Sequence, residues 1–193
     1  MMDISHENIL AQRCQEGQLE YFAELYDTYI ERIYAFLLSR TRNKALAQDI
    51  TSHTFMKAIE KIKTFDASRG TFSAWLYRIA RNTLIDYFRT HKDTVDIDDV
   101  WGISDDTDTI KNAHARLQIE TIRAYLQKLD PDQRDVVLMR VWDELSYKEI
   151  AHIMNKSEGS CKMMFSRTVE KMQKDLGVSM ALLISLISQS HYF

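Results

Sequence analysis

The chain has 193 residues, of which 45% are hydrophobic and 27% are charged, and its formal net charge is −3. This length suffices for one large domain or two small ones, and a single Pro with five Gly argues against a turn-rich β protein. The two cysteines, Cys14 and Cys161, lie far apart without a CxxC motif or His-rich partner, so we expect neither a metal site nor a disulfide framework.

Helical spacing predicts three helices in the first half of the chain. Asn43 suits the N-cap of the second helix, which runs to about residue 62, and the third covers about residues 72–88. Three such helices bury a core, so we expect a first domain over residues 15–92. The apolar stripe of the first helix, over residues 20–38, consists of Phe22, Leu25, Tyr26, Tyr29, Ile33, Phe36 and Leu37.

An acidic segment follows the first domain. Residues 93–110 contain seven Asp and no Lys or Arg, and helical periodicity disappears there. Because such a composition buries little apolar surface, we expect a flexible, solvated linker over residues 93–112. Lys and Arg outnumber Asp and Glu in the segments on either side, residues 57–92 and 156–174. The overall negative charge argues against a chain that coats DNA by charge alone.

Helical spacing resumes beyond the linker, and we expect a second, four-helix domain over residues 113–176. Asp130-Pro131 is a strong helix start, because Asp suits the N-cap and Pro suits the first helical position. Ser146 and Glu149 have the spacing of a capping box. The sequence therefore predicts an all-α protein with two small helical domains joined by the acidic linker.

The end of this domain has the spacing of a helix-turn-helix. A short helix follows Ser146, Asn155-Lys156 forms a turn, and Ser157 caps a longer helix. The second helix of such a motif contacts DNA, where Lys and Ser bond phosphates and Arg reads guanine. An ordinary helical hairpin with a solvated basic face is the alternative. The outward residues of the longer helix are Ser160, Lys162, Met163, Ser166 and Arg167.

Two sets of segments carry a family pattern. One set is Ala47-Gln48-Asp49-Ile50-Thr51 with Ile79-Ala80-Arg81-Asn82, and the other is Glu149-Ile150-Ala151 with Ser157-Glu158-Gly159-Ser160. In order and spacing they resemble the second and fourth conserved regions of sigma-70 factors of RNA polymerase, in the extracytoplasmic-function (ECF) group. Ser52-His53 departs from the usual Gln-Glu of that family.

The resemblance implies a sigma subunit that binds core RNA polymerase and directs promoter recognition, melting of the −10 element and initiation at promoter DNA. It implies no enzymatic activity, cofactor, metal or small-molecule substrate. In this family the second helix docks on a coiled coil of the polymerase clamp. Phe55 and Ile59 also fit the buried face of that helix. The residues assigned to the docking surface are Asp49, Thr51, Ser52, Phe55, Met56 and Ile59.

The third helix and the loop before it resemble the part that opens the −10 element. Holding a melted strand without ATP requires cations for the phosphates and rings or pockets for extruded bases. Asn82 is the leading candidate for base specificity, whereas Phe72 shares the apolar stripe with Trp75, for which we favour a core role. The candidate −10 contacts are Lys61, Lys63, Phe65, Arg69, Phe72, Tyr77, Arg78, Arg81, Asn82 and Arg89.

The last domain resembles the part that reads the −35 element. Free N–H groups at the start of its final helix suit a phosphate. Arg134 near the start of an earlier helix is expected to contact phosphate, with a surface ion pair as its alternative. The candidate −35 contacts are Arg134, Ser157, Glu158, Gly159, Ser160, Lys162, Met163, Ser166 and Arg167.

The apolar tail over residues 177–193 lies outside the family pattern. Its apolar run, residues 178–187, is about half of a membrane span, and the chain shows no signal peptide, so we expect a cytoplasmic protein without membrane contact. The tail is expected to cover exposed core of the last domain, with an anti-sigma protein or a weak membrane contact as alternatives. Two other functions remain open, a free-standing helix-turn-helix regulator and a helical adaptor that binds only proteins.

Overall fold

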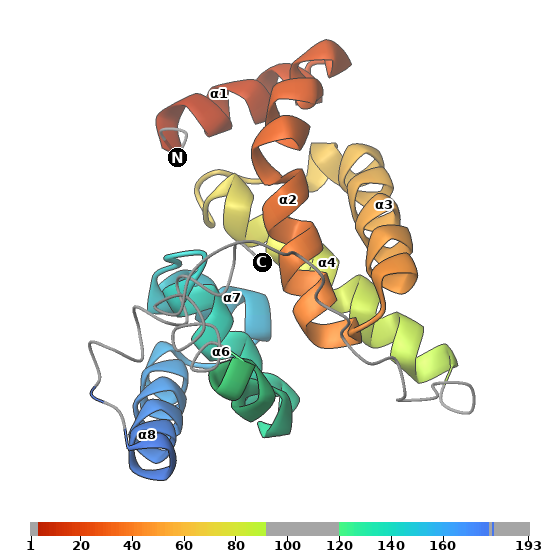
Figure 1. The fold of residues 1–193 in the computed structure, drawn as a ribbon. Coiled ribbons are helices and arrows are strands. Elements are labelled where there is room, and N and C mark those ends of the chain that lie inside the picture. Colours follow the sequence, from red (N-terminus) through yellow and green to blue (C-terminus); the bar gives the residue numbers. More distant parts are fainter. Residues whose placement is uncertain (1–3, 92–119, 178, 180–193) are drawn as a thin grey trace, which may run out of the picture. The chain divides into compact units, whose positions relative to one another are not determined.

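The computed structural model describes residues 4–91, 120–177 and 179. The predicted linker and all but two residues of the predicted tail lie outside these ranges. The chain divides into two compact units, Met1–Trp101 and Gly102–Phe193. Every regular element in the described ranges is a helix, so the predicted all-α fold with two helical domains is confirmed (Figure 1).

In the described part of the first unit there are four helices, with a short 3-10 turn between α1 and α2 and another between α3 and α4. α2 and α3 form a hairpin, and α4 packs against both. The turn between α2 and α3 places Arg42 in the left-handed region with φ 56°, and the side chain of Asn43 caps α3 by accepting from the Leu46 N–H at 2.9 Å. The elements are α1 (Ile4–Gln15), η1 (Leu19–Tyr21), α2 (Phe22–Thr41), α3 (Lys44–Lys61), η2 (Ile62–Thr64) and α4 (Phe72–Thr90).

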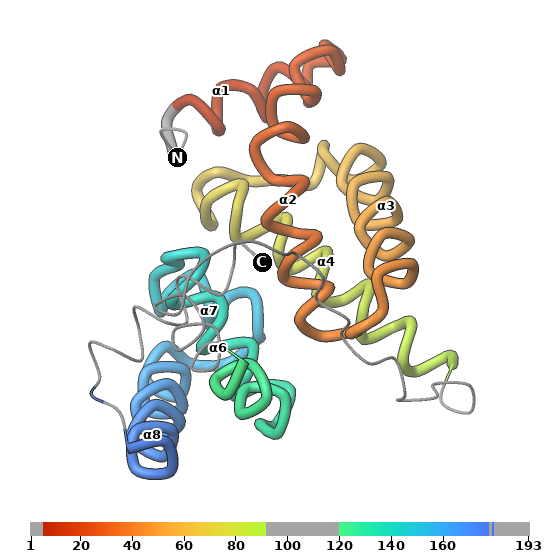
Figure 2. Tube along the Cα trace, in the orientation of Figure 1, coloured from red at the N-terminus to blue at the C-terminus, as the bar shows by residue number. Residues whose placement is uncertain are grey.

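Helix α1 was not predicted, and it extends the first unit beyond the expected start at residue 15. It lies at the N-terminal end of α2 (Figure 2). Leu10, Ala11 and Cys14 are buried at three- and four-residue steps, so α1 shares the core of this unit. The buried face of α1 also includes the acidic Glu7, which interrupts the apolar pattern and explains why periodicity alone gave a weak signal.

Aromatic rings fill the centre of the first unit. The Phe72 ring is completely buried, and it lies within 6.5 Å of the rings of Phe22, Tyr29, Phe65 and Trp75. Edge-to-face contacts of this kind stabilise a core beyond the area that they bury. The favoured core role of Trp75 agrees with these contacts.

The inward stripe predicted for α2 is correct except at one position. Tyr26 is 41% exposed, whereas the other six predicted residues are buried. The Tyr26 ring still packs against the ring of Phe55 of α3, with the two centroids 4.8 Å apart. This partial contact explains why Tyr26 follows the apolar spacing of the stripe.

The second unit contains a helix over residues 120–128 and three further helices in the described residues. Ser146 and Glu149 form the predicted capping box, and Asn155 adopts the left-handed conformation with φ 54° in the turn before Ser157. Pro131 occupies the first turn of its helix as predicted, although Asp130 makes no side-chain cap hydrogen bond. The three helices are α6 (Pro131–Val141), α7 (Tyr147–Met154) and α8 (Glu158–Leu176).

The core of this unit lies where α6, α7 and α8 meet. Val137, Ile150 and Cys161 are each fully buried, one from each helix. Ser157 fixes the start of α8, because its hydroxyl accepts from the Ser160 N–H at 3.2 Å. None of the helices in the described ranges combines the length and hydropathy needed to cross a membrane.

Candidate functional site

The solvent face of α3 presents the first candidate surface. Asp49, Ser52, Met56 and Ile59 follow one another at three- and four-residue steps, and all four are exposed. Met56 is 58% exposed and Ile59 is 41% exposed, so two large apolar side chains face solvent here. This set, called the α3 stripe below, offers apolar and polar groups to a protein partner.

Two residues expected on this surface lie in the core instead. Thr51 is 3% exposed, and its hydroxyl donates to the Ala47 carbonyl oxygen at 2.7 Å. Phe55 is 4% exposed, and its ring packs against Phe22 and Tyr26. The helical period is consistent with the correction, because positions 51 and 55 point to a different side of α3 from the α3 stripe. The exposed Tyr26 beside Phe55 is a candidate contact that sequence reasoning missed.

The outer face of α4 carries basic and polar side chains around the exposed Ile85. Arg78, Asn82 and Arg89 are exposed, and Arg81 is half-buried. The Arg89 guanidinium pairs with Asp86 one turn earlier, at 3.1 Å. Because both side chains of this pair are largely exposed, the pair contributes little to stability and leaves the guanidinium accessible.

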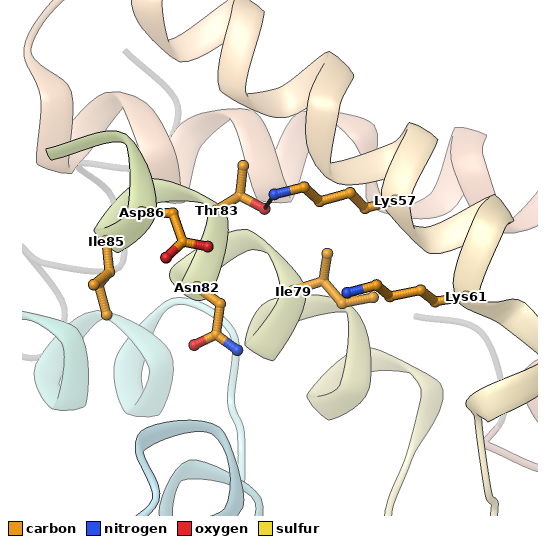
Figure 3. A pocket seen from close by; sticks show the side chains of 7 residues that line it. All are labelled: Lys57, Lys61, Ile79, Asn82, Thr83, Ile85 and Asp86. Atoms are coloured by element: carbon orange, nitrogen blue, oxygen red, sulfur yellow. Dashed lines mark hydrogen bonds between the residues drawn. The ribbon is translucent and has the colours of Figure 1, made fainter. Parts of the chain in front are cut away.

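A hollow of about 300 Å³ opens between α3 and α4 beside Asn82. Figure 3 shows Lys57 and Lys61 extending from α3 toward α4, where the Lys57 Nζ donates to the Thr83 hydroxyl at 3.2 Å. Two ammonium groups and one amide can bind a phosphate oxygen or the edge of a base. Lys57 and Thr83 were not among the candidate site residues, and the excess of basic residues after position 57 was the signal that could have found Lys57. The lining residues are Lys57, Lys61, Ile79, Asn82, Thr83, Ile85 and Asp86.

Three aromatic residues expected to contact bases are buried. Phe65 is 7% exposed, and Phe72 and Tyr77 are 0% exposed. Phe65 and Phe72 belong to the central ring cluster, while the Tyr77 ring lies 5.4 Å from that of Phe36. Their prediction as base contacts is therefore corrected, because a large ring in a small domain gains more from the core than from solvent.

The loop between α3 and α4, residues 62–71 and called the α3–α4 loop below, exposes Lys63 and Arg69. Its tip is a tight turn, in which the Asp66 carboxylate accepts from the Ser68 hydroxyl at 2.7 Å and from the Ser68 N–H at 2.9 Å. These hydrogen bonds lower the pKa of Asp66, with a smaller contribution from the charge of Arg69. Thr71 then caps α4 by accepting from the Ala74 N–H.

The exposed start of α8 presents the third candidate surface. Ser157, Glu158 and Gly159 are exposed, and Ser160 is half-buried. The turn before α8 is tied to α6 by an ion pair between Lys156 and Asp132 at 3.1 Å. Along the same helix the remaining predicted contacts are all exposed, namely Lys162, Met163, Ser166 and Arg167.

Arg134 does not face solvent, contrary to expectation. It is 9% exposed, and its guanidinium donates to the carbonyl oxygens of Leu126 at 2.8 Å and Gln127 at 2.5 Å. A longer bond reaches the Leu129 carbonyl at 3.4 Å. The cation therefore satisfies the last carbonyls of the helix over residues 120–128, where the helix dipole favours positive charge. The expected phosphate contact is therefore corrected, because the guanidinium is buried against these carbonyl oxygens.

Residues 25–94 match the family model for Sigma-70 region 2, and residues 119–172 match that for Sigma-70, region 4. The ECF RNA polymerase sigma factor SigM of Bacillus subtilis (strain 168) is 36% identical over 151 residues, which cover 78% of this chain and 91% of the relative. The chain belongs to the ECF sigma factors. SigW of the same organism is 33% identical to this sigma factor, over 84% of this chain and 92% of the relative.

A solved structure shows the same fold. The sigma factor RpoE of Bartonella quintana, in complex with the anti-sigma factor NepR, matches this sigma factor with a TM-score of 0.68 and 24% identity, over 82% of this chain and 98% of that one. Membership of the family means that this sigma factor binds core RNA polymerase and promoter DNA and directs transcription initiation. The first unit carries region 2 and the second carries region 4, while α1 precedes the region 2 match.

Proposed function

We propose that three separate surfaces of this sigma factor divide the work of initiation. The α3 stripe binds the polymerase clamp, the outer face of α4 with the α3–α4 loop holds the melted −10 strand, and the start of α8 reads the −35 element. Each surface combines exposed side chains with the chemistry that its partner requires. The observation that carries the proposal is the presence of both a region 2 match and a region 4 match on one chain.

The α3 stripe suits a protein surface because its apolar members are large and exposed. Burying Met56 and Ile59 against a partner removes apolar area from water, at roughly 25 cal/mol per Å². Asp49 and Ser52 add hydrogen-bonding groups that fix the register. Tyr26 extends this surface onto α2. When polymerase is absent, an anti-sigma protein is a proposed partner for the same apolar groups.

The α4 surface suits a melted strand because it joins cations to an amide. Arg78, Arg81 and Arg89 attract the phosphates, and Asn82 beside the hollow can accept from and donate to one base edge. Lys57 and Lys61 supply positive charge on the opposite wall. With Phe65, Phe72 and Tyr77 in the core, the proposal assigns base contacts to the amide and the hollow rather than to stacking on those rings.

The start of α8 suits intact duplex. Its first backbone N–H groups and the Lys162 ammonium are donors for phosphates, and the exposed Arg167 can donate twice to the O6 and N7 atoms of guanine. Met163 offers an apolar contact for a thymine methyl group. We propose that the chain performs no chemistry of its own and acts in the cytoplasm, where polymerase core supplies the nucleotidyl transfer.

The test is run-off transcription with purified core polymerase, this chain and a pool of genomic fragments, followed by mapping of the start sites. We expect transcripts that depend on the chain and share two upstream elements. On a mapped promoter, Arg167→Ala should lower the yield about tenfold, as expected for the loss of one bidentate base contact. Lys174→Ala, near the other end of α8, is the matched control and should leave the yield unchanged.

Run-off that is the same with and without the chain would refute the proposal. Equal losses for Arg167→Ala and Lys174→Ala would refute the assignment of the −35 contact to the start of α8. Mapped promoters that lack a shared upstream element would also refute this assignment of the −35 contact.

A further inference from the structure

The side chain of Gln15, the last residue of α1, reaches the start of the α3–α4 loop. Its Nε2 donates to the carbonyl oxygen of Ile62 at 3.0 Å and to that of Phe65 at 2.6 Å. Ile62 opens η2 and Phe65 directly follows it, so both oxygens belong to one turn of the loop. A primary amide has two N–H donors, and these two bonds use both.

Helix α1, which carries this amide, is itself held in place at both ends. At the other end of the helix, the buried Glu7 accepts from the Tyr29 hydroxyl at 2.5 Å. At its own end, Gly17 adopts φ 97°, and the Gln18 N–H donates to the Arg13 carbonyl at 3.0 Å. This closing motif requires a residue that tolerates positive φ, and it ends the helix directly after Gln15. The amide is therefore held at a set position relative to α2.

The loop has a buried part and an exposed part. Ile62 and Phe65 are buried, and the Phe65 ring lies 5.7 Å from that of Trp75. Lys63 and the residues 66–69 are exposed. Gln15 thus binds the backbone where the exposed tip leaves the core, while Thr71 fixes the other end of the loop by capping α4.

We propose that Gln15 is a positioning residue for recognition of the −10 strand. It holds the Ile62 and Phe65 carbonyls so that Lys63 and the tip over residues 66–69 keep one conformation, ready to receive the strand. This inference rests on the proposed role of the α3–α4 loop at the −10 element. Pre-organisation of this kind acts on binding, because a loop that is already ordered loses less entropy when its ligand binds.

The test compares variants as holoenzyme with core polymerase. The ligands are two fluorescent single-stranded oligonucleotides, one with the mapped −10 sequence and one scrambled, and the readout is the ratio of the two affinities. Gln15→Met keeps the length of the side chain and removes both donors, and Gln15→Glu places a carboxylate against two carbonyl oxygens. We expect the ratio to fall on the order of tenfold for Gln15→Met and at least as far for Gln15→Glu.

Three controls make the result specific. Gln12→Met alters an exposed glutamine of the same helix whose amide binds Glu16, and it should keep the wild-type ratio. Gln15→Lys restores a donor of similar reach and should recover part of the ratio. Binding to core polymerase, measured by competition, should be equal in all variants. The affinity ratios are measured at a temperature well below the midpoint of thermal unfolding of the least stable variant.

The outcomes separate the two claims. If Arg69→Ala lowers the affinity for the −10 oligonucleotide but both Gln15 variants keep the wild-type ratio, Gln15 only stabilises the fold, and the inference is wrong while the proposed function stands. If wild-type holoenzyme does not distinguish the two oligonucleotides, or if Arg69→Ala leaves the affinity for both of them unchanged, the role of the loop is wrong and the inference fails with it.

Discussion

The guanidinium of Arg134 lies against the carbonyl end of the helix over residues 120–128, away from solvent. Arg167 lies on α8 with its side chain exposed. The same residue type therefore has two different environments in one unit. A buried cation that satisfies several carbonyls contributes to stability, because its loss leaves those oxygens unpaired. An exposed cation contributes little to stability and is available to DNA.

This difference predicts opposite effects for two matched substitutions. We expect Arg134→Met to destabilise the second unit by about 2–4 kcal/mol, because hydrogen bonds from a charged group are lost in a buried site. Arg167→Met should change stability by less than about 0.5 kcal/mol, as is usual for an exposed position. Thermal unfolding followed by circular dichroism measures both. Equal midpoints for the two variants would contradict the capping role of Arg134.

Helix α1 is anchored by the hydrogen bond between Glu7 and Tyr29. Burial raises the pKa of the Tyr29 phenol, and the hydrogen bond to Glu7 and the charge of that carboxylate raise it further. A pKa that is higher in the folded state stabilises the protein fully below the ordinary tyrosine value of 10.0. That contribution is lost as the pH rises through the higher folded value.

The anchor predicts a stability change that depends on pH. Tyr29→Phe should destabilise the first unit by about 2 kcal/mol at neutral pH, because the Glu7 carboxylate loses a donor in a buried site. The difference from wild type should shrink in strongly alkaline solution, where Tyr29 ionises in the wild-type protein. Tyr34→Phe on the same helix is the control. Chemical denaturation at pH 7 and above pH 10 measures this, and a difference that grows with pH would contradict the argument.

At the scale of elements, local signals predicted most helices of the described residues. Asn43, Ser146 and Ser157 marked helix starts, because a cap depends only on neighbouring residues. Helix α1 was not predicted, because its stability comes from contacts with α2 and with the α3–α4 loop, which is distant in sequence. The aromatic candidates for base contact failed for the same reason. Whether Phe65, Phe72 and Tyr77 face solvent or the core depends on the packing of three helices. The exposure of Asn82, by contrast, could be predicted from its position on the polar side of α4.

We propose that the two units of the molecule carry different tasks on one chain. Region 2 in the first unit presents the α3 stripe and the α4 surface, and region 4 in the second unit presents the start of α8. A free-standing regulator would need only the second unit, and an adaptor that binds proteins alone would need neither basic surface. Membership of the ECF sigma factors resolves these alternatives in favour of a polymerase subunit.

Permanganate footprinting of a mapped promoter tests most directly whether the chain directs promoter opening together with polymerase, because the reagent oxidises unpaired thymines. We expect reactive thymines in the −10 element when core polymerase and this chain are both present, and none with either alone. Substitution of Asn82 by Ala should weaken their reactivity more than substitution of the exposed Glu60. Thymines that react equally without the chain, or a chain that opens the duplex without polymerase, would contradict the account.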